Sequence, residues 1–357
     1  MKTATLPSTQ RRPRIICRAK KAPKKPQLQI KNVLAPTDFS ERSIEALSVA
    51  GNIARRFGAD LHVAHVCEPD YPMVTMTGMP LVLPVVSQAR NVRLHLQDLT
   101  KQLRLTVRPG FTHAAQGRPF EEICRLSKQH EVDLIVIATR GITGFKHLLL
   151  GSTAERVVRY SPCPVLVVHP RQKDENRHLR FDRILVPVDF SECSFKGVEY
   201  AKRLARQFGS RLVLLNSVAL QYFITSDEYA RYDLPLLMRQ TERESRKQMR
   251  DLLANSDWEG IDVKSSLQIG HAGQQICARA AELKADLIVT STHGTTGFKH
   301  VLVGSTAGYV VRHAGCPVLV VPSHDRPRLA SVKGENPSDP LISRLSPGSN
   351  LDAINRI

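Results

Sequence analysis

The sequence has few aromatic residues and no apolar run long enough to cross a membrane. Aromatic residues make up 5% of its 357 residues, and only one tryptophan is present. A membrane-spanning helix needs roughly 18 consecutive apolar residues. The nearest run, residues 79–86, is short and is interrupted by Pro80 and Pro84. The first residues also lack the apolar stretch of a secretory signal. We therefore expect a globular protein that does not enter a membrane.

The seven cysteines form neither a disulfide framework nor a zinc-binding pattern. Their number is odd, no Cys-x-x-Cys pair occurs, and four of them lie inside or beside apolar runs. This distribution is typical of reduced, mostly buried thiols, and it favours a cytoplasmic protein.

Acidic residues are absent from residues 1–28, which hold nine lysines and arginines. Half of the net charge of +18 therefore lies in this segment. It is rich in proline and has no hydrophobic periodicity, so we expect a disordered tail. Two further interpretations stay open for it, an organelle transit peptide and an electrostatic contact with nucleic acid. Residues 323–357 are polar, carry both charges and are also expected to be disordered.

One glycine-rich stretch occurs twice, at residues 141–154 and 294–307, with eleven of fourteen positions identical. Each copy follows an apolar, strand-like run and leads into a helix-like segment. Glycines let the backbone approach an anion closely, and the N–H groups at a helix N-terminus point towards it. The pattern predicts a phosphate-binding loop in two copies.

The repeat extends over most of the chain. Apolar periods and turn residues predict five strands in each half, interleaved with helices. Ser40 is the expected N-cap of the first helix, and Gly58 its expected end. The first half has predicted strands at 30–35, 61–67, 111–115, 132–138 and 164–168, and later helices at 92–105, 118–130 and 152–160. The second half repeats this order, with a long charged helix at 234–254.

These elements predict an α/β protein with two tandem domains, each a doubly wound, five-stranded parallel sheet. Alternating strands and helices with apolar central strands indicate a parallel sheet covered on both faces. By analogy with known sheets, the strand order is 3-2-1-4-5. The expected boundaries are a tail at 1–28, domains at 29–170 and 181–322, a linker at 171–180 and a second tail at 323–357.

In this order strands 1 and 4 are neighbours, and ligands bind where the connections diverge, outside the carboxyl ends of the strands. Asp38 follows strand 1 and the glycine-rich stretch follows strand 4, while Asp189 has the same place in the second half. An acceptor facing a phosphate loop describes a mononucleotide site. The amides of Gly151 and Ser152 are expected to hold phosphate, and Arg140 and His293 are placed to reach it.

Three motifs together resemble the universal stress protein family. They are Ala-Pro-Thr-Asp-Phe-Ser with its repeat Val-Pro-Val-Asp-Phe-Ser, the glycine-rich stretch, and Cys-Pro-Val-Leu-Val-Val at 163–168 and 316–321. The resemblance covers residues 30–170 and 181–322, so the chain looks like a tandem member of the family. It implies an ATP-binding, stress-response regulatory protein.

ATP-binding members of this family carry Gly-x2-Gly-x9-Gly-Ser/Thr. Here the later positions match, but Ala138 and Ser291 replace the first glycine. The resemblance also assigns adenine contacts to the strand-1 aspartate and to the end of strand 2, where Ser217 departs from the usual apolar residue. The predicted contacts are Pro36, Thr37, Asp38, Val66, Ala138, Arg140, Gly141, Gly144, Gly151, Ser152 and Thr153 in the first half. In the second half they are Pro187, Val188, Asp189, Ser217, Ser291, His293, Gly294, Gly297, Gly304, Ser305 and Thr306. The expected ligand is ATP, with or without Mg²⁺, and neither catalytic residues nor protein ligands to a metal are assigned.

Plainer interpretations stand beside these. The glycines are suited to a tight turn whether or not a ligand binds, and Asp38 and Asp189 are also suited to capping a turn. Three functions therefore stay open: a nucleotide-occupancy switch, a slow ATPase, and a scaffold that binds no nucleotide but contacts nucleic acid or an acidic partner through the basic tail. A Walker A lysine, an evident general base and paired carboxylates are all missing, so dedicated catalysis is not expected.

The fifth strand of each half is placed at a sheet edge. An apolar edge strand favours pairing with another copy. We expect the two halves to pair through this strand as a pseudo-dimer within the chain, and whole chains to form a homodimer through it.

Overall fold

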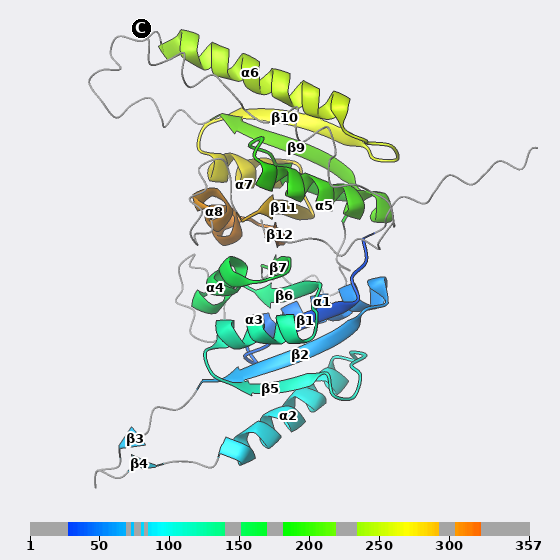
Figure 1. Ribbon diagram of the computed structural model, residues 1–357, viewed down its shortest axis with the longest axis vertical. Coiled ribbons are helices and arrows are strands. Elements are labelled where there is room, and N and C mark those ends of the chain that lie inside the picture. The colour runs from blue at the N-terminus through cyan, green and yellow to red at the C-terminus, as the bar shows by residue number, and fades with distance from the viewer. Residues whose placement is uncertain are drawn as a thin grey trace, which may run out of the picture.

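The computed structural model describes residues 28–68, 73–74, 80–81, 85–139, 151–169, 181–218, 234–292 and 304–322. Within them, the main sheet has ten strands in the order β10-β9-β8-β11-β12-β7-β6-β1-β2-β5 (Figure 1). Each half of this order reads 3-2-1-4-5, which confirms the predicted topology. All pairings in this sheet are parallel except β12 with β7.

The elements of the first half are β1 (Asn32–Pro36), α1 (Glu41–Phe57), β2 (Asp60–Cys67), β3 (Met73–Val74), β4 (Pro80–Leu81), α2 (Val85–Gln102), β5 (Thr112–Gln116), α3 (Pro119–Gln129), β6 (Leu134–Ala138), α4 (Ser152–Tyr160) and β7 (Val165–Val168). Those of the second half are β8 (Arg183–Pro187), α5 (Glu192–Phe208), β9 (Arg211–Val218), α6 (Leu234–Asn255), β10 (Val263–Ile269), α7 (Ala272–Glu282), β11 (Leu287–Ser291), α8 (Ser305–His313) and β12 (Val318–Val321).

Two details of the first half differ from the prediction. Residues 73–74 and 80–81 form a small antiparallel pair, β3 with β4, where no strand was predicted. Helix α2 begins at Val85, earlier than the predicted residue 92. Among the residues of α2 whose side chains are described, the buried apolar ones are Leu96 and Leu99, and both lie inside the predicted range.

The first helix of each half begins and ends as the sequence predicts. The side chains of Ser40 and Ser191 accept hydrogen bonds from the amides of Ser43 and Ser194. Both helices end at a glycine in the left-handed region, Gly58 with φ 66° and Gly209 with φ 67°. Glycine adopts this conformation without the steric penalty that a side chain brings.

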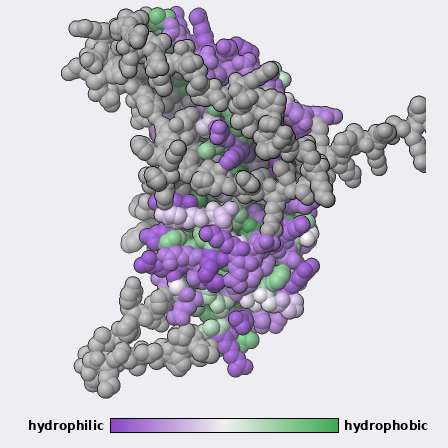
Figure 2. All heavy atoms as spheres, viewed as in Figure 1, coloured by the Kyte–Doolittle hydropathy of each residue, from purple (hydrophilic) through white to green (hydrophobic). Residues whose placement is uncertain are grey.

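Helices cover both faces of the sheet and form two hydrophobic cores. One core joins the sheet to α1, α2, α5 and α6, and the other joins it to α3, α4, α7 and α8. Successive residues of a strand contribute to opposite cores, as Val33 and Leu34 do. Such strands are apolar at nearly every position because both of their faces are buried. On the outside, the described side chains in Figure 2 are mostly hydrophilic.

The two halves join through the fifth strands. Val318, Leu319 and Val320 of β12 lie opposite Val167, Leu166 and Val165 of β7 in antiparallel register. Beside this pair, the rings of Phe57 and Phe208 make an edge contact with centroids 5.4 Å apart. The guanidinium of Arg56 lies 4.0 Å from the Phe208 centroid. These residues close the seam between the halves.

The expected pseudo-dimer within the chain is therefore present. Both β7 and β12 have a neighbour on each side, so neither is an edge strand. A homodimer through the same strand would need an edge strand, and both β7 and β12 already pair on each side. Covalent linkage gives the two halves a high effective concentration, which favours pairing within one chain.

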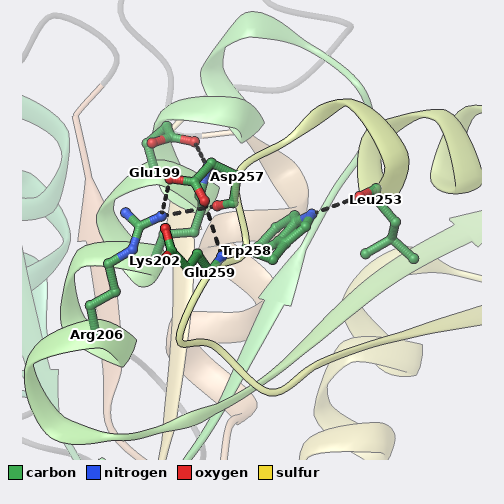
Figure 3. A network of polar contacts seen from close by, with 7 residues as sticks. All are labelled: Glu199, Lys202, Arg206, Leu253, Asp257, Trp258 and Glu259. Carbon is green, nitrogen blue, oxygen red and sulfur yellow. Dashed lines mark hydrogen bonds and ion pairs between the residues drawn. The ribbon is translucent and has the colours of Figure 1, made fainter. Parts of the chain in front are cut away.

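In the second half, the turn after α6 packs against α5 (Figure 3). Buried Lys202 lies 2.5 Å from a Glu199 carboxylate oxygen and 5.0 Å from the Trp258 ring centroid. Arg206 contacts the Asp257 carboxylate at 3.0 Å, and the Trp258 indole donates to the carbonyl of Leu253 at 3.0 Å. The single tryptophan therefore reports on the folding of this half.

The structure also bears on the membrane and thiol predictions. Among the described residues, no helix is both long and apolar enough to span a membrane. The six cysteines in the described ranges form no disulfide with one another; Cys124, Cys163 and Cys316 are buried and the others are half-buried.

Candidate functional site

Each strand-1 aspartate forms a tight turn with the serine two residues later. One Asp38 carboxylate oxygen accepts from the Ser40 amide at 3.1 Å and from its hydroxyl at 2.5 Å. Asp189 repeats this with Ser191 at 3.1 and 2.6 Å. The intervening residue, Phe39 or Phe190, has a φ of 63° or 62°, which is uncommon for a bulky side chain. This capping role is the plainer of the two interpretations. The same hydrogen bonds fix the position of each carboxylate within its own turn.

A second polar link ties the end of strand 1 to strand 2. In the first half, a ring nitrogen of His65 lies 2.8 Å from the carbonyl oxygen of Thr37. In the second half, the Asn216 amide donates to the carbonyl of Val188, also at 2.8 Å. Neither His65 nor Asn216 was predicted to belong to the site. The signal for them was a polar residue at the same place near the end of strand 2 in both halves.

The next residue of strand 2 differs between the halves. Val66 is half-buried and packs against the core on the α3 side. The hydroxyl of Ser217 donates to the carbonyl of Gly270 at 3.0 Å. The hydroxyl is thus directed to the turn between β10 and α7. The departure from an apolar residue at this place has a local structural role.

The two residues that flank each glycine-rich segment are hydrogen-bonded to one another. The amide of Gly151 donates to the carbonyl of Thr139 at 2.7 Å, and Gly304 donates to Thr292 at 2.7 Å. The start of α4 is thereby held at the end of β6, and the start of α8 at the end of β11. The Gly151 amide therefore has a partner inside the protein, and its predicted contact with phosphate stays a prediction.

The starts of α4 and α8 contain further backbone amides beyond those of Gly151 and Gly304. In the described part of the chain, no side chain caps α4 or α8. Helix N-termini leave several N–H groups without a partner inside the helix, and these groups favour an anion. The predicted phosphate contacts among the described residues all lie at these two helix starts: Gly151, Ser152 and Thr153 at α4, and Gly304, Ser305 and Thr306 at α8. Their contact with phosphate stays a prediction.

Six predicted contacts lie outside the described residues, and the structure gives no account of them. These are Arg140, Gly141, Gly144, His293, Gly294 and Gly297.

The position of the family's first glycine lies inside the sheet. Ala138 is the last residue of β6 and pairs with Val168, and Ser291 is the last residue of β11 and pairs with Val321. Both are buried, with exposed fractions of 7% and 8%. Each substitution therefore adds a small side chain at a strand end.

The candidate site of the second half lies next to the seam between the two halves. A small cavity of about 90 Å³ is lined by Glu155 and Arg159 of α4 and by Gly304, Ser305 and Arg312 from the second half. The start of α8 thus lies beside a helix of the first half.

The fold and the paired strand-end sites define a tandem, doubly wound α/β protein with its candidate ligand sites at the switch points of the sheet. The sequence model of the universal stress protein family matches residues 29–169 and 180–322. The chain therefore belongs to the universal stress protein family, as a tandem member.

Individual relatives agree with this assignment. A universal stress protein of Mycolicibacterium smegmatis is 27% identical over 304 residues, covering 83% of this chain and 97% of the relative. One from Methanocaldococcus jannaschii is 33% identical over 148 residues, covering 40% of this chain and 85% of the relative. The crystal structure of a universal stress protein from Archaeoglobus fulgidus shares the fold, with a TM-score of 0.56 and 24% identity over 83% of this chain and 97% of that one.

Proposed function

We propose that this protein is a stress-response regulator that binds an adenine nucleotide, ATP in the first place, past the carboxyl ends of β1 and β6 and of β8 and β11. Nucleotide occupancy then changes its conformation or its partners. The observation that carries the proposal is the bond from Gly151 to Thr139, repeated from Gly304 to Thr292. It holds an uncapped helix start beside the aspartate turn at the switch point of each half.

Within each site, the residues divide by chemistry. The turns at Asp38 and Asp189 and the backbone near Val66 and Ser217 lie on the adenine and ribose side. The first-turn amides of α4 and α8 lie on the phosphate side. The glycine-rich segments, including Arg140 and His293, are proposed to close over the phosphates. Any Mg²⁺ would enter with the triphosphate.

The same geometry favours binding over turnover. A general base must reach the proton that it removes, whereas both carboxylates accept hydrogen bonds from serines in their own turns. We therefore propose a switch in which ATP hydrolysis is slow at most.

A scaffold without nucleotide is the second candidate, and the aspartate turns favour it. Their hydrogen bonds give Asp38 and Asp189 a structural role that needs no ligand. In this case the basic segment 1–28 is the proposed contact for nucleic acid or an acidic partner.

The test begins with the purified protein, which is denatured so that any released nucleotide can be identified by mass spectrometry. ATP binding to nucleotide-free protein is then measured calorimetrically for Ser152→Asp, Ser305→Asp and both together. An acidic residue in the first turn suits the helix dipole but repels phosphate. Each change should weaken its own site at least about tenfold, or about 1.4 kcal/mol. The matched Ser→Ala changes should have little effect.

The outcomes separate the three functions. Protein that carries no nucleotide and fails to bind added ATP would remove the switch in favour of the scaffold. Steady ATP turnover that the double aspartate variant loses would establish an enzyme. A salt-sensitive nucleic-acid shift that disappears with residues 1–28 would support the tail contact.

A further inference from the structure

Three histidines of the first half converge at the outer edge of the sheet, away from the strand ends discussed above. His62 belongs to β2, His113 to β5, and His130 is the residue that ends α3. One ring nitrogen from each lies within 4.8 Å of those of the other two. His62 and His113 are closest, with Nδ1 and Nε2 3.1 Å apart. Three separate elements thus place three imidazoles around one point.

His62 faces the cluster with one ring nitrogen only. Its Nδ1 is the atom that lies 3.1 Å from His113, whereas its Nε2 is directed away from the cluster and has no hydrogen-bond partner among the described residues. The side chain is only 2% exposed, so packing fixes the ring and holds Nδ1 towards the other two histidines.

We propose that His62, His113 and His130 form a binding site for a divalent transition-metal ion, with zinc as the best match and a fourth position open to water. Imidazole is a preferred ligand of such ions. Tetrahedral zinc with Zn–N bonds near 2.0–2.1 Å separates its ligand atoms by about 3.3 Å. The closest pair is already at this spacing, and the others need to move by at most about 1.5 Å.

The site has an entrance from solvent. A surface groove of about 740 Å³ runs along β5 between α2 and α3 and is lined by both His113 and His130. Arg93, Arg125 and Glu122 also line it. The two guanidinium groups oppose a cation, but Arg125 is held by Glu122 at 2.7 Å. These basic surroundings disfavour an ion that is held only by electrostatic attraction. They favour a transition-metal ion, because its bonds to nitrogen also contribute to the binding free energy.

The second half builds the same corner without histidine. His113 pairs with Ala64 of β2 as Ser266 pairs with Leu215 of β9, and Val213 takes the place of His62. Leu283 ends α7 as His130 ends α3. The fold therefore does not require these histidines, and the second half provides substitutions that the corner accepts.

The experiment uses the full chain, stripped of metal and free of nucleotide, titrated with Zn²⁺ alone by calorimetry and with Co²⁺ by absorption. The triple variant His62→Val, His113→Ser, His130→Leu copies the second half. His271→Ala is the control outside the cluster. The wild type and the control should bind one more Zn²⁺ per chain than the triple variant. A Co²⁺ spectrum of nitrogen ligation should appear only in the first two.

The single variant His113→Ser should weaken Zn²⁺ binding by more than about a hundredfold. This single variant tests the proposal even if the triple variant fails to fold. Trp258 emission and circular dichroism will show whether each variant is folded. Equal Zn²⁺ stoichiometry and affinity in the wild type and in either cluster variant would overturn the proposal. Absence of Zn²⁺ binding by the wild type would overturn it as well.

Discussion

At the scale of single residues, the two halves use different side chains for the same hydrogen bond to the backbone. The carbonyl of the residue that follows strand 1 lies 2.8 Å from a ring nitrogen of His65 in the first half and from the amide nitrogen of Asn216 in the second. Asn216 is 5% exposed, so its hydrogen bond acts in a dry environment where an unpaired carbonyl is costly. The interaction matters here more than the residue that makes it.

Two thiols, the buried Cys124 and the half-buried Cys277, allow a prediction at this scale. Burial raises the pKa of Cys124 to about 11, against a small opposing effect of Lys128, and it raises the pKa of Cys277 to about 11. The raised pKa keeps each thiol protonated at pH 8, and only the thiolate is nucleophilic. A pKa of about 11 in place of the ordinary 9.0 lowers the fraction of each thiol that is thiolate about a hundredfold.

Iodoacetamide should therefore label Cys124 and Cys277 about a hundredfold more slowly in the native protein at pH 8 than in urea. Peptide mass spectrometry measures the labelling at each site. Labelling should speed up as the pH rises towards 11. Equal rates in native and unfolded protein would contradict the assignment.

At the scale of elements, the helix ends show what local sequence achieves alone. Gly209 ends α5 with φ 67°, and a Cβ added there would meet nothing within 4 Å. The glycine is thus required by backbone conformation and not by space. Gly315, after α8, is equally open but lies outside the left-handed region.

Gly209→Ala should lower the free energy of unfolding by about 1 kcal/mol, because alanine is strained in the left-handed region. Urea denaturation followed by Trp258 fluorescence reports on the affected half. Gly315→Ala is the matched control and should stay within about 0.5 kcal/mol of the wild type. If both variants unfold at the same midpoint, the conformational explanation is wrong.

At the scale of the whole molecule, the seam makes one sheet and two continuous cores from two domains. The contact of Phe57 with Phe208 joins the ends of α1 and α5, and β7 with β12 joins the strands. A structure built in this way should unfold with its halves coupled.

Phe57→Ala, a change in the first half, should therefore lower the urea midpoint that Trp258 reports from the second half. The expected loss is about 1–3 kcal/mol, less than for a fully buried phenylalanine because Phe57 is half-exposed. Leu94→Ala on α2, 52% exposed, is the control. A Trp258 transition that Phe57→Ala leaves unchanged would mean that the halves unfold independently.

The two-fold repeat, the alternation of strands and helices and the caps of α1 and α5 could be predicted from the sequence. They follow from apolar periodicity and from turn residues, which act over a few positions. The strand order was predicted by analogy with known sheets, and the pairing of the fifth strands was predicted both within the chain and between chains. The candidate site was also within reach, because strand order places Asp38 and the start of α4 together.

The hydrogen bonds that are already made inside the protein could not be predicted, because they depend on how distant segments pack. The tertiary structure shows Gly151 bonded to Thr139 and Asn216 to Val188. It also shows that both fifth strands are covered within one chain. The histidine cluster is the clearest case, since His62 and His130 are separated by 68 positions (130 − 62) in the sequence. No local pattern predicts their meeting, because it depends on which strand takes the edge and where α3 ends against it.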